Sequence, residues 1–528
     1  MAPSLIPPEG KGVAFIDLGT NSIRLLVVRL NGNGSYAIQR KEKEFIRLGE
    51  GEFRTGRLQP RAMDRAVVVA GRFRDLALSY GVDEIVAVAT AATRDAENRV
   101  AFLDRLRDEA GLDVRVVSGK EEARLIYLGV AWGTRIDKGE VFFIDIGGGS
   151  TEIIAGDGDC HDYLDSLKVG AIRLTNLFFD DKETGPVPDE RYALLTRYVR
   201  NAALRSLQRL KGRSFSRTLG SSGTLLNLVE MNRRRTGSSR LSLEELQNLR
   251  RYLCGLDLKE RRNQPGINPE RADIIIAGAA IVETIMAELA LPPLEPSPFG
   301  LQEGLLLDHL QRALPELVRG LSVRERSVLQ LCRSCHFDEP HARHVQSLAL
   351  ELFDGARRLG LHDLGDGERD LLRHVALLHD LGLFLSFSNH HAHSHYIVSN
   401  AELLGFDERE IAVMAVTAFY HRKKLPKKKH PPFAALDRPS RKAVRYLSLF
   451  LRLAESLDRS HAAAVRSVDL ALADDDAVRL RLDCRQDCRL ELWQLEEHRA
   501  GFKALLKRPF RVELSQKGKD AGDNPEVA

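Results

Sequence analysis

A glycine-rich segment after an apolar run carries the first residues that could do chemistry. Residues 141–144 read VFFI, and residues 145–152 continue as DIGGGSTE. Because glycine has no Cβ, the backbone N–H groups of residues 147–149 can approach an anion closely. Acidic and hydroxyl side chains flank the three glycines. The pattern predicts a β-hairpin that binds phosphate, and the alternative is a plain tight turn.

A second segment near the start of the chain repeats this arrangement. Residues 12–17 read GVAFID, residues 18–22 read LGTNS, and residues 23–30 form another apolar run. Short apolar runs bounded by turn residues are typical of buried strands. One such hairpin is weak evidence for a phosphate site. Two of them predict two related halves that face each other across a cleft.

Two charged residues between the hairpins could act on a bound phosphate. Ser118 and Glu121 have the spacing of a capping box, in which the Glu121 carboxylate returns to the start of the helix. Glu122 is then free to orient and deprotonate a water molecule that attacks a phosphoryl group. Arg94, just beyond an apolar strand, could clamp phosphate with its guanidinium group. The alternatives are an acid that stabilises a helix N-terminus and a solvated surface arginine.

The elements that would position these groups alternate between strands and helices. Periodicity predicts helices over residues 58–80, 99–110 and 122–132, and strands over residues 84–90 and 114–117. Further along, it predicts a glycine-rich turn at 218–224 before a helix at 225–231, an apolar helix over 270–290, and a turn at 296–304. We expect Arg271, at the start of the apolar helix, to point at the cleft.

Seven motifs, in order along the chain, resemble the Ppx/GppA phosphatase family of exopolyphosphatases and guanosine pentaphosphate phosphohydrolases. They are DLGTNSIRL (17–25), ATAATRDAEN (89–98), SGKEEARLIYLGV (118–130), DIGGGSTE (145–152), GSSGT (220–224), ERADIIIAGA (270–279) and FGLQEG (299–304). The resemblance implies an α/β fold with two actin/hexokinase/Hsp70-like (ribonuclease H-like) domains, at residues 11–131 and 132–315, facing across a cleft. One departure is Gln302, where the family usually has arginine.

The resemblance also implies roles for individual residues. Glu122 matches the catalytic glutamate, Arg94 would neutralise charge beside it, and the implied reaction is Mg²⁺-assisted attack of water on a terminal phosphoryl group. Asp145 and Glu152 match positions that bind metal as well as phosphate. The implied phosphate-binding residues are Asp17, Gly19, Thr20, Asn21, Ser22, Asp145, Gly147, Gly148, Gly149, Ser150, Thr151, Glu152, Ser222 and Arg271.

Histidines gather in the last third of the chain, from about residue 323. Four of the residues there, His341, the pair His379 and Asp380, and Asp458, resemble the ligands of HD-type metal phosphohydrolases. Imidazole and carboxylate groups suit Mn, Fe, Zn or Mg. The resemblance implies an all-α HD-like domain over residues 320–465, whose site either holds a second divalent metal or is a vestige. We expect a small α/β module over 466–515 and a disordered tail over 516–528.

The composition bounds the class of protein. A chain of 528 residues should form three or four domains, and 43% hydrophobic with 29% charged residues is typical of globular proteins. A net charge of +4 does not argue for nucleic acid. The N-terminus lacks an apolar signal segment, so we expect a cytoplasmic protein without a membrane partner. Cys332, Cys335 and His336 match a haem-attachment pattern that requires export, which leaves two ordinary thiols as the preferred interpretation.

These patterns together predict an exopolyphosphatase that removes terminal phosphoryl groups processively from inorganic polyphosphate. The basic loop at residues 421–430, with lysines at 427–429, favours a long polyanion over guanosine pentaphosphate, whose 5′-phosphohydrolysis is the main alternative. A kinase or ATPase of the same superfamily should show an adenosine-binding element and a catalytic aspartate. A sensor without turnover, and a second hydrolase in the HD-like region, are further alternatives. The resemblance also implies a homodimer.

Overall fold

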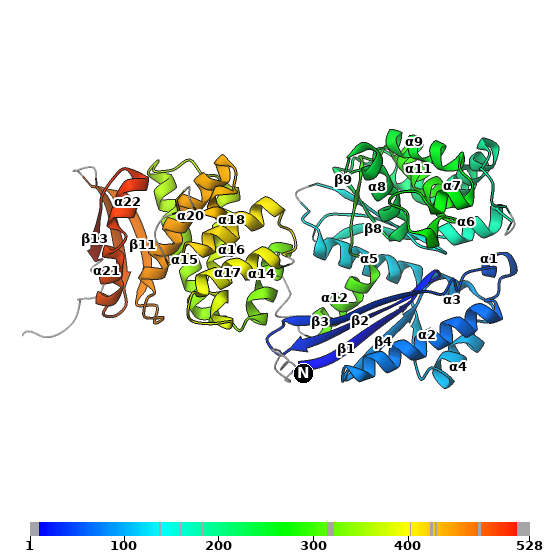
Figure 1. Ribbon diagram of the computed structural model, residues 1–528, viewed down its shortest axis with the longest axis horizontal. Helices are drawn as coiled ribbons and strands as arrows, with labels where there is room; N and C mark the ends of the chain where they lie inside the picture. The colour runs from blue at the N-terminus through cyan, green and yellow to red at the C-terminus, as the bar shows by residue number, and fades with distance from the viewer. Residues whose placement is uncertain are drawn as a thin grey trace, which may run out of the picture. The chain divides into compact units, whose positions relative to one another are not determined.

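A computed structural model of the chain describes residues 10–136, 139–158, 160–180, 183–313, 321–401, 403–422, 426–427, 430–473 and 477–514. It divides into two compact units, Met1–Val323 and Arg324–Ala528, and each is described by itself (Figure 1). The predicted disordered tail at 516–528 lies outside the described residues. So do Lys428 and Lys429 of the basic loop, whereas Lys427 lies within them.

The first sheet contains the first predicted hairpin. Its strands are β1 (Gly10–Leu18), β2 (Ser22–Asn31), β3 (Tyr36–Phe45), β4 (Glu84–Ala89) and β5 (Val114–Val116), in the order β3-β2-β1-β4-β5. The first three strands pair antiparallel, and β4 and β5 continue the sheet in parallel with β1. The predicted hairpin is confirmed, because its register closes at Leu18 opposite Ile23 and leaves a turn between them.

The second sheet repeats this topology. Its strands are β6 (Val141–Ile146), β7 (Thr151–Gly156), β8 (His161–Leu167), β9 (Arg217–Ser221) and β10 (Leu294–Pro296), in the order β10-β9-β6-β7-β8. Here too the first three strands form an antiparallel meander, and the next two run parallel to the first. The glycine-rich hairpin therefore occupies in this sheet the place that the first hairpin has in the other. Much of the segment at 218–224, which we predicted to be a turn, belongs instead to β9.

Helices cover both sheets of the first unit (Figure 1). They are α1 (Glu52–Thr55), α2 (Pro60–Ser79), α3 (Ala91–Asp95), α4 (Arg99–Asp108), α5 (Gly119–Gly133), α6 (Ala171–Phe178), α7 (Asp189–Leu210), α8 (Gly223–Thr236), α9 (Leu243–Cys254), α10 (Leu258–Arg262), η1 (Pro269–Arg271), α11 (Ile275–Leu289) and α12 (Leu301–Ala313). The predicted apolar helix at 270–290 is α11 preceded by the 3₁₀ turn η1. Because α11 is apolar on nearly all sides, it forms the middle of the second half's core.

Helix α5 contacts both halves of the first unit. One of its faces, with Leu125, packs with α12 against Val13 and Phe15 of β1. The opposite face, with Ile126, packs against the second sheet. A Cβ on Gly129 of α5 would lie 2.1 Å from the carbonyl oxygen of Gly300. A Cβ on Gly304 of α12 would lie 1.9 Å from the carbonyl oxygen of Leu125, so both positions require glycine for α5 and α12 to approach this closely.

The second unit is a helical bundle followed by a three-stranded sheet (Figure 1). Its helices are α14 (Val323–Ser334), α15 (Glu339–Arg358), α16 (Asp366–Leu378), η2 (Leu381–Phe384), α17 (His390–Asn400), α18 (Glu408–Phe419), α19 (Pro431–Ala434) and α20 (Arg438–Leu457). The sheet consists of β11 (Val465–Leu472), β12 (Val478–Cys484) and β13 (Phe510–Leu514), with α21 (Arg489–Glu496) and α22 (Arg499–Leu506) between β12 and β13.

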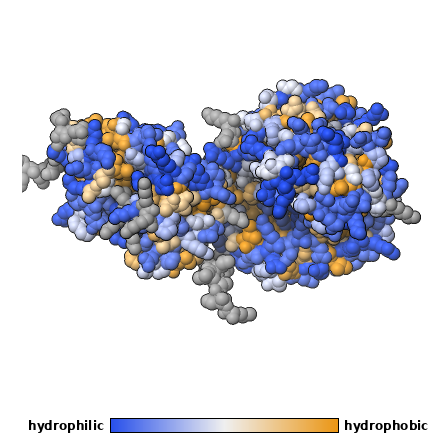
Figure 2. Space-filling view, turned by 45° about the horizontal axis from the view of Figure 1, so that its top comes forward, coloured by the Kyte–Doolittle hydropathy of each residue, from blue (hydrophilic) through white to orange (hydrophobic). Residues whose placement is uncertain are grey.

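Two remaining expectations concern the surface and the thiols. In the described part of the chain, no helix combines the length and apolar character needed to cross a membrane. The face in Figure 2 is mostly hydrophilic. Cys332 is a buried free thiol, and Cys335 is a partly buried one. This agrees with two ordinary thiols in a helical domain.

The contact between α5 and α12 gives a test of the fold. We expect Gly304→Ala to lower the free energy of unfolding of the first unit by about 2–3 kcal/mol, because the new methyl group overlaps the backbone of α5. Chemical denaturation measures this. The control is Gly71→Ala in α2, where a Cβ meets only ordinary contacts from 3.7 Å and helix propensity should add about 0.5–1 kcal/mol. Equal stability of Gly304→Ala and wild type would contradict the close contact.

Candidate active site

A cavity of about 450 Å³ lies between the two halves of the first unit. It is lined by the β1–β2 turn, the β6–β7 turn, the first turn of α5, the starts of α8 and α12, and parts of β2 and β3. The structure brings into this lining most of the predicted site residues: Asp17, Gly19, Thr20, Asn21, Ser22, Glu122, Asp145, Gly147, Gly148, Gly149, Ser150, Ser222 and Arg271. Thr151, Glu152 and Arg94 are not among the residues that line it.

The glycines of the second hairpin fit against the first hairpin. A Cβ on Gly148 would lie 2.9 Å from the Cβ of Thr20, and one on Gly149 would lie 2.8 Å from the Cβ of Ala91. The two hairpins therefore meet at the floor of the cleft. The N–H of Gly147 donates to the carbonyl of Ser150 and closes the turn. This leaves Gly148 and Gly149 as the better candidates for anion binding.

Four carboxylates lie close enough to affect one another's ionisation. Burial raises the pKa of Asp17 to about 6 and the pKa of Glu122 to about 7, even though Arg24 and Arg94 oppose these shifts. Burial also raises the pKa of Asp145, against a hydrogen bond from Ser221. The pKa of Glu152 rises through burial and through its proximity to Glu122 and Asp145.

Several buried polar atoms in or beside the cleft have no hydrogen-bond partner among the described residues. They are Asp17 Oδ1, Asn21 Nδ2, Glu152 Oε2, Ser222 Oγ and Gln302 Nε2. Since buried polar groups are normally paired, these atoms indicate that the cleft is built for a polar ligand. Asp17 and Glu152 offer carboxylate oxygens, which suit a hard cation such as Mg²⁺.

The cap of α5 differs from the predicted capping box. Ser118 accepts a hydrogen bond from the N–H of Glu121, as predicted. The Glu121 carboxylate, however, pairs with Arg124 at 2.9 Å, because that guanidinium lies three residues further on the same helix face. The predicted return of this carboxylate to the cap is therefore wrong, but the conclusion that the cap leaves Glu122 unused still holds.

Glu122 is held by Arg94 rather than left unpaired. Arg94 Nη1 donates to Glu122 Oε2 at 2.7 Å and to the carbonyl of Val117 at 3.1 Å. Arg94 does not line the main cavity. With Ser150 and Lys168 it lines a neighbouring hollow of about 420 Å³. The geometry thus makes Arg94 a positioning group for the Glu122 carboxylate.

Sequence reasoning missed cations on the strands of the cleft wall, although it predicted Arg271. Arg24 on β2 stands in register between Asp17 on β1 and Lys43 on β3. Burial lowers the pKa of Lys43 to about 8 and that of Arg271 to about 10, and in each case neighbouring cations add to the effect. The sequence shows Arg24 within the apolar run of β2, but its neighbours depend on strand register.

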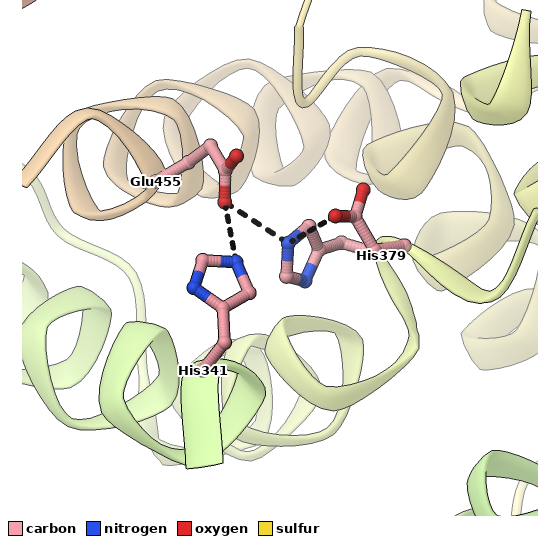
Figure 3. A group of neighbouring side chains, drawn as sticks. His341, His379 and Glu455 are labelled. Atoms are coloured by element: carbon pink, nitrogen blue, oxygen red, sulfur yellow. Dashed lines mark hydrogen bonds and ion pairs between the residues drawn. The ribbon is translucent and has the colours of Figure 1, made fainter. Parts of the chain in front are cut away.

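Three of the four predicted metal ligands of the second unit, His341, His379 and Asp380, come together, and the fourth member of the group is Glu455 rather than Asp458. His341 Nε2 and His379 Nε2 each lie 3.1 Å from Glu455 Oε2 (Figure 3). Asp380 stands beside His379. Asp458 instead approaches the other ring nitrogen of His341, Nδ1, at 2.8 Å. The assignment of Asp458 as a ligand is therefore corrected. Glu455, three residues earlier on α20, takes that place.

Two family models match this chain, and the boundary between the matched regions agrees with the boundary between the two units. A model of the Ppx/GppA phosphatase family matches residues 27–313, more than half of the chain. The chain belongs to the Ppx/GppA phosphatase family. A model of domain III of Ppx/GppA phosphatases matches residues 323–499, in the second unit. Membership identifies the protein as a hydrolase of phosphoanhydride bonds.

Solved structures of the family resemble this one. An exopolyphosphatase from Cytophaga hutchinsonii is 26% identical, with 57% of this chain and 98% of that chain covered, at a TM-score of 0.53. An exopolyphosphatase-like protein is 28% identical, with 58% and 99% covered, at a TM-score of 0.52. A Ppx/GppA family member from Aquifex aeolicus is 27% identical, with 58% and 99% covered, at a TM-score of 0.48.

Burial of Asp17 gives a pH-dependent test. Its pKa rises from an ordinary 3.8 to about 6 in the folded protein, so the folded state binds a proton that the unfolded state releases between these values. Ionised Asp17 therefore costs about 3 kcal/mol of stability above pH 6 and nothing below pH 4. We expect Asp17→Asn to stabilise the first unit at pH 8 but not at pH 4, by denaturation without divalent metal. Equal effects at both pH values would contradict this, and the exposed Asp113→Asn is the control.

Proposed function

We propose that this phosphatase is an exopolyphosphatase that hydrolyses the terminal phosphoanhydride of inorganic polyphosphate, with Glu122 activating the water. The observation that carries the proposal is the place of Glu122. Its carboxylate, with a pKa raised to about 7, lines a cavity whose floor consists of two hairpins with phosphate-binding character. A general base is most effective when its pKa lies near the working pH.

The hairpins would hold the terminal phosphoryl group. Gly148 and Gly149 line the floor without side chains, and Asn21 and Ser222 in the same lining each have a buried polar atom with no partner among the described residues. Arg94 would keep the Glu122 carboxylate oriented, since it donates to one oxygen and leaves the other available to the water. Arg271 would offset the negative charge that develops during the reaction.

The charges of the cleft favour a divalent cation with the substrate. Its lining includes five carboxylates (Asp17, Glu42, Glu122, Asp145 and Glu303) and four cations (Arg24, Lys41, Lys43 and Arg271). A polyanion would be repelled by these acids unless a cation accompanied it. Family members generally depend on a divalent metal, and we propose Mg²⁺ held by Asp145 and Glu152 together with phosphate oxygens. Mg²⁺ typically takes few protein ligands and completes its shell with substrate and water. The metal would neutralise phosphoryl oxygens.

Cations on strands β2 and β3, which form one wall of the cleft, favour polyphosphate over guanosine pentaphosphate. Arg24 and Lys43 are directly opposite each other across β2 and β3, and Lys41 lies two residues beyond Lys43 along β3. Like charges in opposite register destabilise a sheet unless an anion lies between them. This row of three cations would bind successive phosphate groups of one polyphosphate chain. Hydrolysis of the 5′-phosphate of guanosine pentaphosphate remains the second candidate function, and Phe299 in the lining offers a ring for its base.

A kinase or a polyphosphate sensor would differ from a phosphatase in simple measurements. A kinase would transfer phosphate to an acceptor, and a sensor would bind polyphosphate without releasing phosphate.

The proposed homodimer is tested by light scattering of the full chain.

Substitution of Glu122 tests the proposed base. We expect Glu122→Gln to lower phosphate release from polyphosphate at least 100-fold while substrate binding persists, because the amide cannot accept the proton of water. The rate of wild type should fall as the pH drops below about 7, where Glu122 becomes protonated. The control is Glu121→Gln, which alters the adjacent ion pair with Arg124. A Glu122→Gln variant with more than about a tenth of the wild-type rate would exclude this base.

The cationic row makes a separate prediction about the substrate. We expect Lys43→Gln to raise KM for long polyphosphate several-fold, and to raise it more than KM for triphosphate. The slope of log KM for polyphosphate against log salt concentration should fall by about one, because one phosphate contact is lost. Steady-state phosphate release at several salt concentrations measures this. The exposed Lys11→Gln, whose partner is Glu84, serves as the control. A larger effect on guanosine pentaphosphate than on polyphosphate would favour the second candidate.

A further inference from the structure

Four histidines and two acids converge in the second unit, whereas the proposed chemistry belongs to the first. They come from α15 (His341), the end of α16 (His379, Asp380), α17 (His390), the end of α18 (His421) and α20 (Glu455). The potential ligand atoms form two groups. His341, His379, Asp380 and Glu455 make the first, and Asp380, His390 and His421 make the second. Asp380 belongs to both.

The far ring nitrogen of each histidine is held by an acceptor. Nδ1 of His379 lies 2.8 Å from the carbonyl of Ala376, and Nδ1 of His421 lies 2.7 Å from that of Ala418. Nδ1 of His390 lies 3.0 Å from the carbonyl of Phe387, with Arg422 Nη1 more distant at 3.5 Å.

His341 completes this set, because its Nδ1 lies 2.8 Å from Asp458. A carbonyl or carboxylate oxygen can only accept, so each Nδ1 carries the proton. In each ring Nε2 is therefore the nitrogen that faces the acids and is left to bind a metal ion. Metal-bound histidines are normally anchored in this way.

The inward nitrogen atoms face other acceptors at short range. His390 Nε2 and His421 Nε2 lie 3.1 Å apart. His421 Nε2 lies 3.1 Å and His390 Nε2 3.4 Å from Asp380 Oδ1. Asp380 Oδ1 is nevertheless buried without a hydrogen bond from the described residues.

The first group shows the same arrangement around Glu455. Its Oε2 lies 3.1 Å from both His341 Nε2 and His379 Nε2, and Asp380 Oδ2 lies 3.7 Å from His379 Nε2 (Figure 3). Lone pairs that face one another repel unless a cation lies between them. Ligand atoms about 2.0–2.2 Å from one metal ion are separated by about 3–3.5 Å, which is close to the spacing here.

We propose that the second unit holds a dinuclear centre for first-row transition-metal ions, bridged by the Asp380 carboxylate. One ion would be bound by His341, His379, Glu455 and Asp380 Oδ2. The other would be bound by His390, His421 and Asp380 Oδ1. Imidazole-rich sites select Mn, Fe, Co or Zn over Mg²⁺, so this centre would differ in metal from the proposed site of the cleft.

A small molecule could reach the proposed centre. A cavity of about 270 Å³ is lined by His341 and Asp380, and by Phe384 and His461. The second ion would have only three protein ligands, which would leave positions for water, as in metal sites that act on substrates.

Metal content and Co²⁺ spectra of the full-length protein test the proposal. We expect wild type, loaded with Co²⁺ and desalted, to retain about two ions per chain and to show visible d–d absorption from imidazole coordination. The double variant His390→Ala/His421→Ala should retain about one. Asp380→Asn should weaken binding of both ions at least tenfold.

Two controls separate this centre from other effects. His393→Ala, on the same helix as His390 but in neither group, should retain two ions. Asp145→Asn, which alters the cleft, should keep the Co²⁺ spectrum, so failure of the proposed cleft function would not mimic failure here. Circular dichroism checks folding, and His421→Gln replaces the double variant if that variant unfolds. Fewer than two ions in wild type, or equal content in wild type and the double variant, would overturn the dinuclear centre in favour of a network of protonated histidines.

Discussion

Close packing of α5 between two sheets is the constraint on which the first unit depends. One face of the helix completes the core beneath the first sheet, and the other completes the core beneath the second. The crossing with α12 is so close that Gly129 and Gly304 leave no space for a methyl group. A helix fixed on three sides cannot rotate or slide without opening two cores. Its first turn, with Glu122, is therefore held between the two hairpins as rigidly as the cores themselves.

This rigidity explains how the cleft keeps ionisable groups in an unfavourable environment. Asp17, Glu122 and Glu152 are buried and Asp145 is partly buried beside them, and the pKa of each is raised. Such a cluster costs folding free energy, which the cores on either side offset. Perturbed carboxylates and unpartnered polar atoms gathered in one cavity are typical of functional sites rather than of structural ion pairs.

The sequence was sufficient for those features that depend on local patterns. Both hairpins, the cap at Ser118 and the repeated halves followed from apolar runs, glycines and hydroxyl residues near one another in the chain. Features that depend on distant elements could not be predicted in this way. Arg24 and Lys43 become neighbours through strand register, and Glu455 meets His341 only because α15 and α20 pack together. Glu121 shows a local competition that pattern alone did not resolve, since Arg124 was a stronger partner than the cap.

The meeting of the two hairpins has a mechanical consequence. Gly148 rests on Thr20, and Arg173 of the second half pairs with Asp95 of the first. Arg47 and Asp273 add another link, with 2.6 Å between their charged groups. These contacts tie the two halves together at the floor of the cleft, in addition to the helix α5 that packs against both sheets. The spacing between the two hairpins is therefore set by contacts on either side of the floor and not by α5 alone.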